Sequence, residues 1–525
     1  MNILLSGDEA VAQAVAEAGV GIATAYPGTP STEVLENILI RAPKTDATWC
    51  VNEKNAFEVA YGAAVAGMRS ITAMKHVGLN VAADPLMTSA YTGINAGFVI
   101  AVADDPGMYS SQNEQDTRRY AFFAKMPMLE PSNSQEALDF TKLAFELSER
   151  FDIPVILRLT TRVAHTKTAV TVNPSVPFSG GFTFKKNPQK YVMIPAYALN
   201  RHYQLEATNE KLGVYSDALK LNRIERNKKS TMGIITAGVD YEYVREAFPE
   251  ANILKIAMVN PLPKKLITKF AASVKKLYVM ESLEPFIEEQ VRAMGIKLEP
   301  RLHSLVGELN VDILSVYKGK KAATKKAAAP ALPGRPPMLC KGCSHREVFD
   351  AIKNIGALVT GDIGCYTLGA LPPFNTMDTC LCMGASVTMA SGFNRVKKLA
   401  GSGEPVVAVL GDSTFIHTGI PGLIDAVYNK TNITVVILDN YVTAMTGHQP
   451  NPATGLTAKG EVTERLDLEA LVRGCGVKRV VKFNPYKEKN MEAIIKQEID
   501  ANEVSVILAE APCIFYKKRF PEGVR

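Results

Sequence analysis

The chain has 525 residues, of which 47% are hydrophobic and 21% are charged, and its formal net charge is +6. This length favours about three domains in a globular protein. A nucleic-acid-binding function is not expected, because the positive excess is small and such proteins present a dense basic face. We find no secretory signal and no apolar run near the roughly 20 residues that span a bilayer. A cytoplasmic protein without a membrane span is therefore expected.

Residues 1–185 alternate short apolar runs with helical patterns, which is typical of βα units around a mostly parallel sheet. Asn133 and Glu136 are spaced as a capping box, and apolar residues then recur at helical intervals as far as Phe151. Pro154 predicts the end of this helix, before a strand at residues 155–159. We predict a first α/β domain over residues 1–185.

Residues 186–317 show a second α/β pattern, with predicted strands near 233–237, 253–259 and 277–280. The stretch 318–337 is rich in lysine, alanine and proline and has no apolar periodicity, so we predict a flexible linker there. A third domain follows at residues 338–525. Its β-branched runs at 406–410, 433–438 and 504–508 predict a parallel sheet that is covered on both faces.

Polar residues follow two of these strands in the third domain. Gly411, Asp412 and Ser413 come directly after the first, and Asn440 comes shortly after the second. The carboxyl ends of parallel strands are where α/β sheets bind their ligands. Magnesium needs oxygen ligands that it can share with phosphate groups, so we expect it to be bound by Asp412, Asn440 and the backbone carbonyl of Val442. A dinucleotide site is not expected, because no G-x-G-x-x-G opens a helix.

This arrangement resembles the thiamine-diphosphate motif, in which Gly-Asp-Gly is followed by an asparagine one helix and one strand later. Ser413 replaces the second glycine, a variant that resembles large subunits of the indolepyruvate:ferredoxin oxidoreductase family. The segments 26–32, 75–80 and 111–116 are similar to the same family, and the likeness covers nearly the whole chain. It implies two thiamine-diphosphate-binding domains with parallel sheets, for the pyrimidine and for the diphosphate, around a transketolase C-terminal-like domain. It also implies that the cofactor binds between the first and third domains.

The resemblance assigns catalytic residues in the first domain. Glu53 stands at a predicted strand-to-helix turn and is expected to hydrogen-bond the cofactor's pyrimidine ring from a largely apolar position, where burial keeps its proton. Glu58, one helical turn later, is the rival for this role. Thr29, within the Tyr-Pro-Gly-Thr-Pro segment, is expected to reach the reacting carbonyl of the substrate.

Two interpretations of the cysteine cluster stay open. Cys340 and Cys343 form a C-x₂-C pair that could bind zinc together with Cys380 and Cys382, although the C-x-C half is atypical. The family resemblance instead places Cys343 and Cys365 in the lining of the cofactor pocket. An iron–sulfur cluster is not favoured by this spacing.

The same resemblance adds four residues to the predicted pocket. Gly364 and Thr446 are expected to line it near the reactive end of the cofactor. His345 and His448 are candidate proton donors or substrate contacts, because histidine titrates near neutral pH. A purely structural role remains open for each of these two histidines.

The resemblance implies oxidative decarboxylation of an aryl 2-oxoacid to an acyl-coenzyme A, with thiamine diphosphate and Mg²⁺ as cofactors. It also implies a smaller oxidoreductase subunit, a ferredoxin-type electron acceptor and a hetero-oligomer built on a dimer. The chain departs from the family because it has no C-x₂-C-x₂-C-x₃-C-P run. We expect a partner subunit to carry the clusters. The alternatives are a shortened sequence, a non-oxidative decarboxylase or carboligase, and a non-catalytic scaffold.

Overall fold

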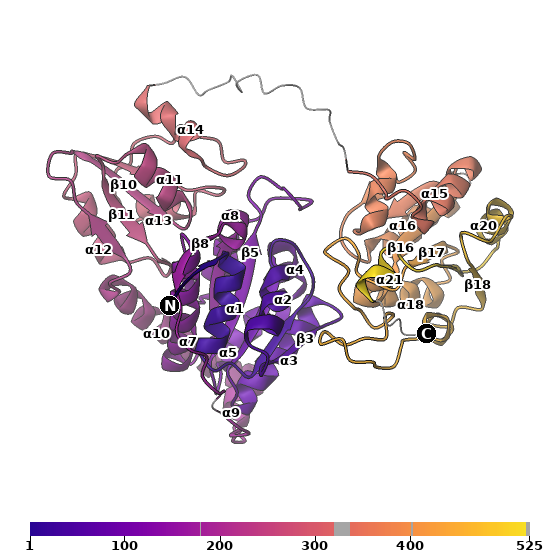
Figure 1. Ribbon diagram of the computed structural model, residues 1–525, viewed down its shortest axis with the longest axis horizontal. Helices are drawn as coiled ribbons and strands as arrows, with labels where there is room; N and C mark the ends of the chain where they lie inside the picture. The colour runs from indigo at the N-terminus through magenta and orange to yellow at the C-terminus, as the bar shows by residue number, and fades with distance from the viewer. Residues whose placement is uncertain (179, 320–336, 401–402, 521–525) are drawn as a thin grey trace. The chain divides into compact units, whose positions relative to one another are not determined.

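The computed structural model describes residues 1–178, 180–319, 337–400 and 403–520. The chain forms two compact units, unit 1 at residues 1–331 and unit 2 at residues 332–525 (Figure 1). The predicted first and second domains both fall in unit 1, and the predicted third domain falls in unit 2. The predicted linker lies mostly outside the described residues. The domain boundaries at 185 and 317 stay predictions.

The main sheet of unit 1 has seven strands in the order β12-β6-β7-β5-β4-β2-β3. Strands β2 to β7 are parallel to their neighbours, as the alternating pattern predicted, and β12 is antiparallel to β6. Every residue of the central strand β5 is buried, which explains its continuous apolar run. The strands are β2 (Ile22–Ala25), β3 (Asp46–Trp49), β4 (Ser70–Lys75), β5 (Phe98–Asp104), β6 (Met128–Leu129), β7 (Val155–Thr160) and β12 (Met258–Asn260).

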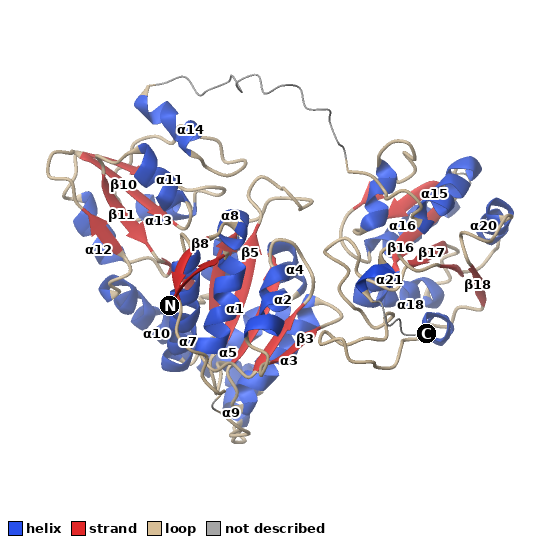
Figure 2. Ribbon diagram, in the orientation of Figure 1, coloured by secondary structure: helices blue, strands red, loops and turns tan. Residues whose placement is uncertain are grey.

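Helices pack around this sheet, as Figure 2 shows, and a separate antiparallel pair, β1 (Asn2–Leu5) with β8 (Thr168–Thr171), lies beside them. Helix α1 contacts both α2 and α7, whereas α3 contacts α4 and α5. Right-handed crossovers put α2 and α7 on one face and α3 to α6 on the other, because these two groups connect strands in opposite directions along the sheet. The helices are α1 (Gly7–Glu17), α2 (Thr32–Arg41), α3 (Glu53–Ala66), α4 (His76–Val81), α5 (Ala83–Thr92), α6 (Thr117–Ala124), α7 (Ser134–Phe151), α8 (Thr161–His165), α9 (Pro188–Tyr191) and α10 (Pro195–Ala218).

Helix α7 shows how the local sequence sets an element. The side chain of Asn133 accepts a hydrogen bond from the backbone N–H of Glu136 at 3.0 Å, as predicted. The Glu136 carboxylate does not close the predicted box on Asn133, however. It accepts the backbone N–H of Ser132 at 2.9 Å, one residue before the predicted partner Asn133, because it also pairs with the buried Lys255.

The second sheet of unit 1 has four strands in the order β13-β10-β11-β9, and a shared hydrophobic cluster joins it to the main sheet. The predicted strand at 253–259 is wrong as one element, because β11 and β12 join different sheets and β12 pairs irregularly with β6. A continuous apolar run cannot show such a change of sheet. The elements are β9 (Arg223–Glu225), β10 (Met232–Ala237), α11 (Asp240–Ala247), β11 (Asn252–Ile256), α12 (Lys264–Ala271), β13 (Lys276–Val279), α13 (Phe286–Ala293), α14 (Val311–Leu314) and η1 (Ser315–Lys318).

Unit 2 is built on a six-stranded sheet in the order β15-β14-β16-β17-β19-β18, and all of its pairs are parallel. This arrangement confirms the predicted parallel sheet. A helical stretch begins directly after β16 and contains a π-helical segment, η3. The elements are α15 (Ser344–Ile355), β14 (Leu358–Gly361), η2 (Cys365–Ala370), β15 (Thr379–Cys380), α16 (Ala385–Ala400), β16 (Val406–Gly411), α17 (Asp412–Thr414), η3 (Phe415–Gly419), α18 (Ile420–Tyr428), β17 (Thr434–Asp439), α19 (Leu468–Gly474), β18 (Arg479–Phe483), α20 (Met491–Ile499), β19 (Ser505–Glu510) and α21 (Tyr516–Arg519).

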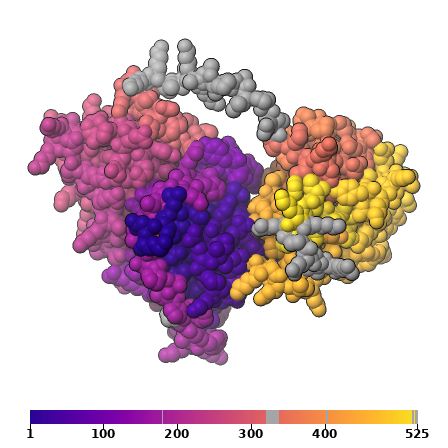
Figure 3. Space-filling model, viewed as in Figure 1, coloured from indigo at the N-terminus to yellow at the C-terminus, as the bar shows by residue number. Residues whose placement is uncertain are grey.

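The first residues of the chain lie on the surface of unit 1, where they form the dark indigo patch in Figure 3. Among the helices that the structure describes, none is long and apolar enough to cross a bilayer.

Candidate functional site

The polar residues predicted in the third domain lie together at one edge of the unit 2 sheet. Asp362 follows β14, Asp412 follows β16 and Asn440 follows β17, and these three strands are neighbours. All three residues are buried. The carboxyl ends of parallel strands meet at one edge, so the fold itself brings Asp412 and Asn440 to the place where α/β sheets bind ligands.

Hydrogen bonds join the Asp412 turn to the loop that follows β17. The Asp412 carboxylate accepts the backbone N–H of Ser413 at 2.7 Å, and the side-chain amide of Asn451 lies 3.5 Å from its other oxygen. The Thr443 hydroxyl donates to the Ser413 hydroxyl at 3.0 Å. Sequence analysis missed Asn451 and Thr443. The signal that could have found them is their polarity within a dozen residues after Asn440.

Two buried carboxyl groups lie side by side at this edge. Burial raises the pKa of the Asp412 carboxyl well above its usual range, and the neighbouring Asp439 carboxylate raises it further. Burial also raises the pKa of Asp439 to about 6, although Arg465 opposes this with an ion pair at 3.2 Å. Both hydrogen-bond donors to Asp412 are neutral groups. A divalent cation here would therefore stabilise the ionised form of Asp412.

Asn440 connects this edge to the first turn of α15. Its side-chain oxygen accepts the backbone N–H of Val442 at 3.2 Å, and its side-chain nitrogen lies 3.4 Å from Nε2 of His345. His345 is buried, and burial lowers its pKa to about 4. The His345 ring is therefore neutral near pH 7, so it can accept or donate a hydrogen bond but carries no charge.

A cavity of about 150 Å³ lies beside Asn440 and brings together four of the residues predicted for the pocket. These four are Cys343, Cys365, His345 and His448. Its apolar wall consists of Leu339, Leu368, Met445, Ile514 and Phe515. The cavity thus combines a few polar groups with an apolar wall, which is the usual character of a small-molecule site.

Two thiols of this cavity, those of Cys343 and Cys365, are in their neutral form. Burial raises the pKa of Cys343 to about 11 and that of Cys365 to about 12. Nucleophilic attack needs a thiolate, so these two neutral cysteines contribute apolar lining to the cavity.

The zinc interpretation of the cysteine cluster finds no support in the structure. All eight cysteines are free. Within the described ranges, three or more His, Cys, Asp or Glu ligand atoms come within 4.8 Å of one another only at Asp8, Glu33 and His165. The predicted pairs Cys340–Cys343 and Cys380–Cys382 therefore do not assemble one set of ligands.

Two predicted glycines leave room for Tyr366, which sequence analysis did not single out. A Cβ on Gly411 would lie 2.7 Å from the Tyr366 ring, and one on Gly364 would lie 2.5 Å from it. The Tyr366 hydroxyl donates to the Ile363 carbonyl at 2.7 Å and lies 2.6 Å from the Thr414 hydroxyl. The ring thereby connects the turn after β14 to the turn after β16.

Thr446 closes a turn in the loop after β17. Its hydroxyl donates to the side-chain carbonyl of Gln449 at 2.6 Å, and the Gln449 amide donates back to the Thr446 carbonyl at 2.9 Å. His448 lies within this turn, and its ring packs edge-on against Phe515 with ring centres 5.7 Å apart. Neither Thr446 nor Gly364 lines the cavity, whereas His448 does.

Glu53 is the first residue of α3, in the turn after β3, and it is buried. A Cβ on Gly78 would lie 2.5 Å from the Glu53 carboxylate, so glycine at that position leaves space for this side chain. The rival Glu58 is exposed and forms an ion pair with Lys54 on the same helix. Of the two glutamates, Glu53 alone has the buried position that the predicted role requires.

Thr29 lies in the turn between β2 and α2, at the carboxyl edge of the main sheet of unit 1. The hydroxyl of Ser110 donates to the Thr29 carbonyl at 3.0 Å, and Lys75 donates to the Ser110 carbonyl at 2.8 Å. Burial lowers the pKa of Lys75 to about 8, against the opposing effect of Asp105 and Glu53. Lys75 thus lies near Glu53 and can exchange a proton close to neutral pH, and the sequence did not single it out.

Comparisons with known proteins agree with this geometry. Residues 13–211 match the family model "Pyruvate flavodoxin/ferredoxin oxidoreductase, thiamine diP-bdg", and residues 362–509 match "Thiamine pyrophosphate enzyme, C-terminal TPP binding domain". The chain is 41% identical to the indolepyruvate oxidoreductase subunit IorA of Archaeoglobus fulgidus, over 99% of this chain and 88% of that protein. The chain belongs to the IorA family.

Two further proteins resemble this IorA-family chain. It is 39% identical to the IorA subunit of Methanothermobacter thermautotrophicus, over 98% of this chain and 87% of that protein. A solved 2-oxoglutarate:ferredoxin oxidoreductase from Magnetococcus marinus has a similar fold, with a TM-score of 0.51 and 18% identity over 61% of this chain and 65% of that one. The family matches and the parallel sheets confirm the predicted α/β fold with thiamine-diphosphate-binding domains.

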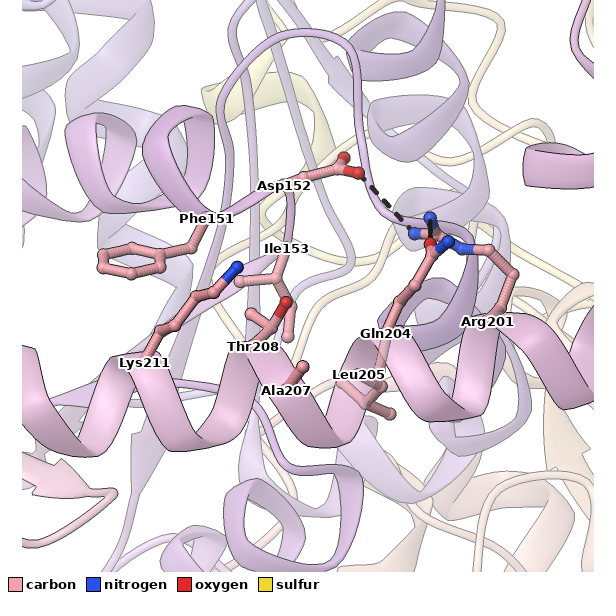
Figure 4. A pocket seen from close by; sticks show the side chains of 10 residues that line it. Phe151, Asp152, Ile153, Arg201, Gln204, Leu205, Ala207, Thr208 and Lys211 are labelled. Atoms are coloured by element: carbon pink, nitrogen blue, oxygen red, sulfur yellow. Dashed lines mark hydrogen bonds and ion pairs between the residues drawn. The ribbon is translucent and has the colours of Figure 1, made fainter.

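A second cavity of the IorA-family chain, of about 230 Å³, lies in unit 1 between the end of α7 and helix α10 (Figure 4). Arg201 on α10 faces Asp152 across it at 3.6 Å. Asp152 and Ile153 precede β7, so this cavity lies at the amino end of that strand. Thr29 and Lys75 lie at the opposite edge of the sheet, and the cavity is therefore not part of the candidate site.

Proposed function

We propose that this chain is the thiamine-diphosphate-binding catalytic subunit of a 2-oxoacid oxidoreductase that acts on an aryl 2-oxoacid such as indolepyruvate. The observation that carries the proposal is the pair Asp412 and Asn440 at one carboxyl edge of a parallel sheet, in a chain of the IorA family. When bound, thiamine diphosphate supplies the carbon nucleophile that makes decarboxylation of a 2-oxoacid possible.

Unit 2 is proposed to hold the diphosphate and its magnesium ion. Asp412 and Asn440 offer the oxygen donors that Mg²⁺ prefers, and a backbone carbonyl such as that of Val442 is the third proposed ligand. The chemistry of this donor set fits the cation, because the buried Asp412 carboxyl lies beside the buried Asp439 carboxyl and accepts hydrogen bonds from neutral groups of Ser413 and Asn451. Ser413 and Gly411 belong to the same turn, where the helical backbone N–H groups after Asp412 favour an anion.

Unit 1 is proposed to supply the activating carboxyl group. Glu53 is buried beside Gly78, at the carboxyl edge of the main sheet of unit 1. Its role is to hydrogen-bond the cofactor's pyrimidine ring. Thr29 is proposed to orient the substrate carbonyl from the same edge of the sheet.

The apolar wall of the unit 2 cavity favours an aromatic substrate side chain. Leu339, Met445 and Phe515 offer contacts to a ring, and the neutral His345 offers a hydrogen bond. This lining favours a 2-oxoacid with a larger, apolar side chain over pyruvate.

Exchange of Glu53→Gln tests the catalytic role. The amide keeps the shape of the side chain but cannot share a proton in the same way, so turnover is expected to fall by at least about 100-fold. Thiamine diphosphate binding, followed by calorimetry, should stay near that of the wild type. Glu58→Gln is the matched control on the same helix and should keep full activity. Near-normal turnover of the Glu53→Gln variant would disprove the assignment.

Electron transfer is proposed to need a smaller partner subunit with iron–sulfur clusters, with coenzyme A as acyl acceptor. The test is an anaerobic assay of the chain with its co-expressed partner, indolepyruvate, coenzyme A and a viologen dye. Dye reduction that depends on coenzyme A supports the oxidoreductase. Carbon dioxide release with a free aldehyde or acyloin and no dye reduction would establish a non-oxidative decarboxylase or carboligase. Absence of any cofactor binding would indicate a scaffold.

A further inference from the structure

Three side chains of unit 1 that play no part in the proposed reaction converge on one point. Asp8, Glu33 and His165 each offer one ligand atom, and these atoms all lie within 4.8 Å of one another. They come from three different helices. Asp8 is in the first turn of α1, Glu33 is in the first turn of α2, and His165 is the last residue of α8. Residues 8 and 165 are brought together only by the tertiary fold.

The burial of the Asp8 carboxylate without a hydrogen-bond partner points to a ligand. It is fully buried, with 0% of its surface exposed, and neither of its carboxylate oxygens has a hydrogen-bond partner among the described residues. Burial of a carboxylate without a partner is costly, so such groups are paired, protonated or bound to a metal ion. The next residue shows the contrast, because Glu9 accepts the backbone N–H of Ser6 and pairs with Lys167 at 3.2 Å.

The backbone holds the three helices close together at this point. A Cβ on Gly7 would collide with the backbone carbonyl of Val163 in α8, so glycine at this position allows α1 to approach α8. Helix α1 also packs against α2. Glu33 and His165 lie 3.8 Å apart, and His165 remains exposed, with 42% of its side chain accessible. The cluster is therefore buried on the Asp8 side and open to solvent on the His165 side.

We propose that Asp8, Glu33 and His165 bind a divalent first-row transition-metal ion. Two carboxylates and one imidazole form a mixed oxygen and nitrogen set, which suits Mn²⁺, Fe²⁺ or Zn²⁺ better than Ca²⁺ or Mg²⁺. Solvent on the open side supplies the remaining ligands as water. The ion offsets the two carboxylate charges, one of which is fully buried, that the fold brings together here.

The position of this site suggests what the ion stabilises. Helix α2 follows the turn that carries Thr29, and Thr161 at the start of α8 donates to the Asp105 carboxylate at 2.7 Å. Asp105 in turn accepts the backbone N–H of Ser110 at 2.8 Å, and Ser110 donates to the Thr29 carbonyl. An ion that joins α1, α2 and α8 therefore holds α2, which follows the Thr29 turn, and α8, which is linked to that turn through Asp105 and Ser110.

The test is Mn²⁺ binding to the full-length chain without thiamine diphosphate, counted by equilibrium dialysis and by the electron paramagnetic resonance of free Mn²⁺. Manganese is the probe because it prefers oxygen and nitrogen ligands over the thiols of this chain. We expect one saturable ion per chain. Loss of an outer partner of a metal ligand already costs about 10–100-fold in affinity, so Asp8→Asn and His165→Gln are each expected to weaken binding by about 100-fold or more.

Two control variants separate this site from other effects. Glu36→Gln removes an acidic group one turn later on α2 and should keep the ion. Asp412→Asn removes the proposed magnesium ligand of unit 2 and should also keep it, so failure of this site and failure of the proposed cofactor site are distinguishable. Mn²⁺ should also raise the unfolding temperature of the wild type and of the Asp412→Asn variant, but not that of His165→Gln.

Absence of a saturable ion in the wild type would overturn the proposal and leave Asp8 as a buried protonated carboxyl. Retention of the ion in both Asp8→Asn and His165→Gln, or its loss in Asp412→Asn alone, would overturn it as well. His165 is exposed, so its variant keeps the test valid even if the Asp8 variant fails to fold.

Discussion

Replacement of Arg118 by methionine should destabilise unit 1 far more than the same change at the next residue. Arg118 is 2% exposed and bonds to Asp116 at 2.5 Å and to Glu281 at 2.7 Å. It also donates to the Ser282 carbonyl at 3.0 Å. This network joins the predicted first and second domains, because Glu281 follows β13. Methionine keeps the apolar volume beside Phe286 but removes the charge and the donors.

The magnitude follows from the two carboxylates that stay buried in the variant. Asp116 keeps the backbone N–H of residue 118 at 3.0 Å and a distant Arg158 at 3.8 Å. Glu281 keeps Arg301 at 3.4 Å and two backbone N–H groups. Breaking a buried pair from one side costs about 3–5 kcal/mol. Arg119 also packs over Phe286, but its side chain is 41% exposed, and its ion pairs with Glu284 and Glu289 contribute about 0–1 kcal/mol.

The assay is urea unfolding followed by tryptophan fluorescence. The chain has one tryptophan, Trp49 in β3, so the signal reports on unit 1. Arg118→Met is expected to lower the free energy of unfolding by about 3–5 kcal/mol, and Arg119→Met by less than about 1 kcal/mol. Equal effects of the two substitutions would refute the reasoning, because burial and pairing would then not decide the energy of these arginines.

Three further predictions concern the active-site edge and the response to pH. Gly78→Ala should displace the Glu53 carboxylate and lower turnover by about tenfold or more. Gly62 has open space around it, so Gly62→Ala should leave turnover unchanged. The same control should stabilise helix α3 by about 0.4–1 kcal/mol. Lys75 should react with acetic anhydride with a pH midpoint near 8, measured by mass spectrometry of its peptide against the other lysine peptides; a midpoint near 10 would contradict its burial. Burial lowers the pKa of His303 from 6.5 to about 4, so the unfolded state alone takes up this proton as the pH falls through that window, and unit 1 loses stability there. At low pH the wild type should lose about 1–3 kcal/mol of unfolding free energy that the His303→Gln variant does not lose. An unchanged pH profile of urea unfolding in the variant would rule out His303 as the cause.

Much of the site could be predicted because residues that follow parallel strands in the sequence lie at the same edge of the sheet. A buried strand reads as an apolar run, and the polar residue that ends it must lie at the carboxyl edge. Asp412 and Asn440 follow adjacent strands, so their convergence needed no knowledge of distant contacts. Glu53 was predictable in the same way, as the first residue after a strand and a turn.

Other features depend on groups that the sequence keeps far apart. The strand predicted at 253–259 divides between two sheets, because pairing partners decide where a strand belongs and an apolar run does not name them. The low pKa of Lys75 and the space for Glu53 beside Gly78 arise from packing between separate βα units. Gly364 and Gly411 leave room for the Tyr366 ring, which local patterns did not reveal.

By itself the sequence determined the α/β class, the parallel sheet of unit 2, the carboxyl-edge residues and the family. Each of these depends on residues near one another in the chain, whose periodicity and spacing express local backbone geometry. Only the tertiary structure decided which charges are buried together, as in the Arg118–Glu281 pair and the Asp8–Glu33–His165 cluster. Burial and long-range pairing set the energy of a charge, and neither is encoded in the residues beside it.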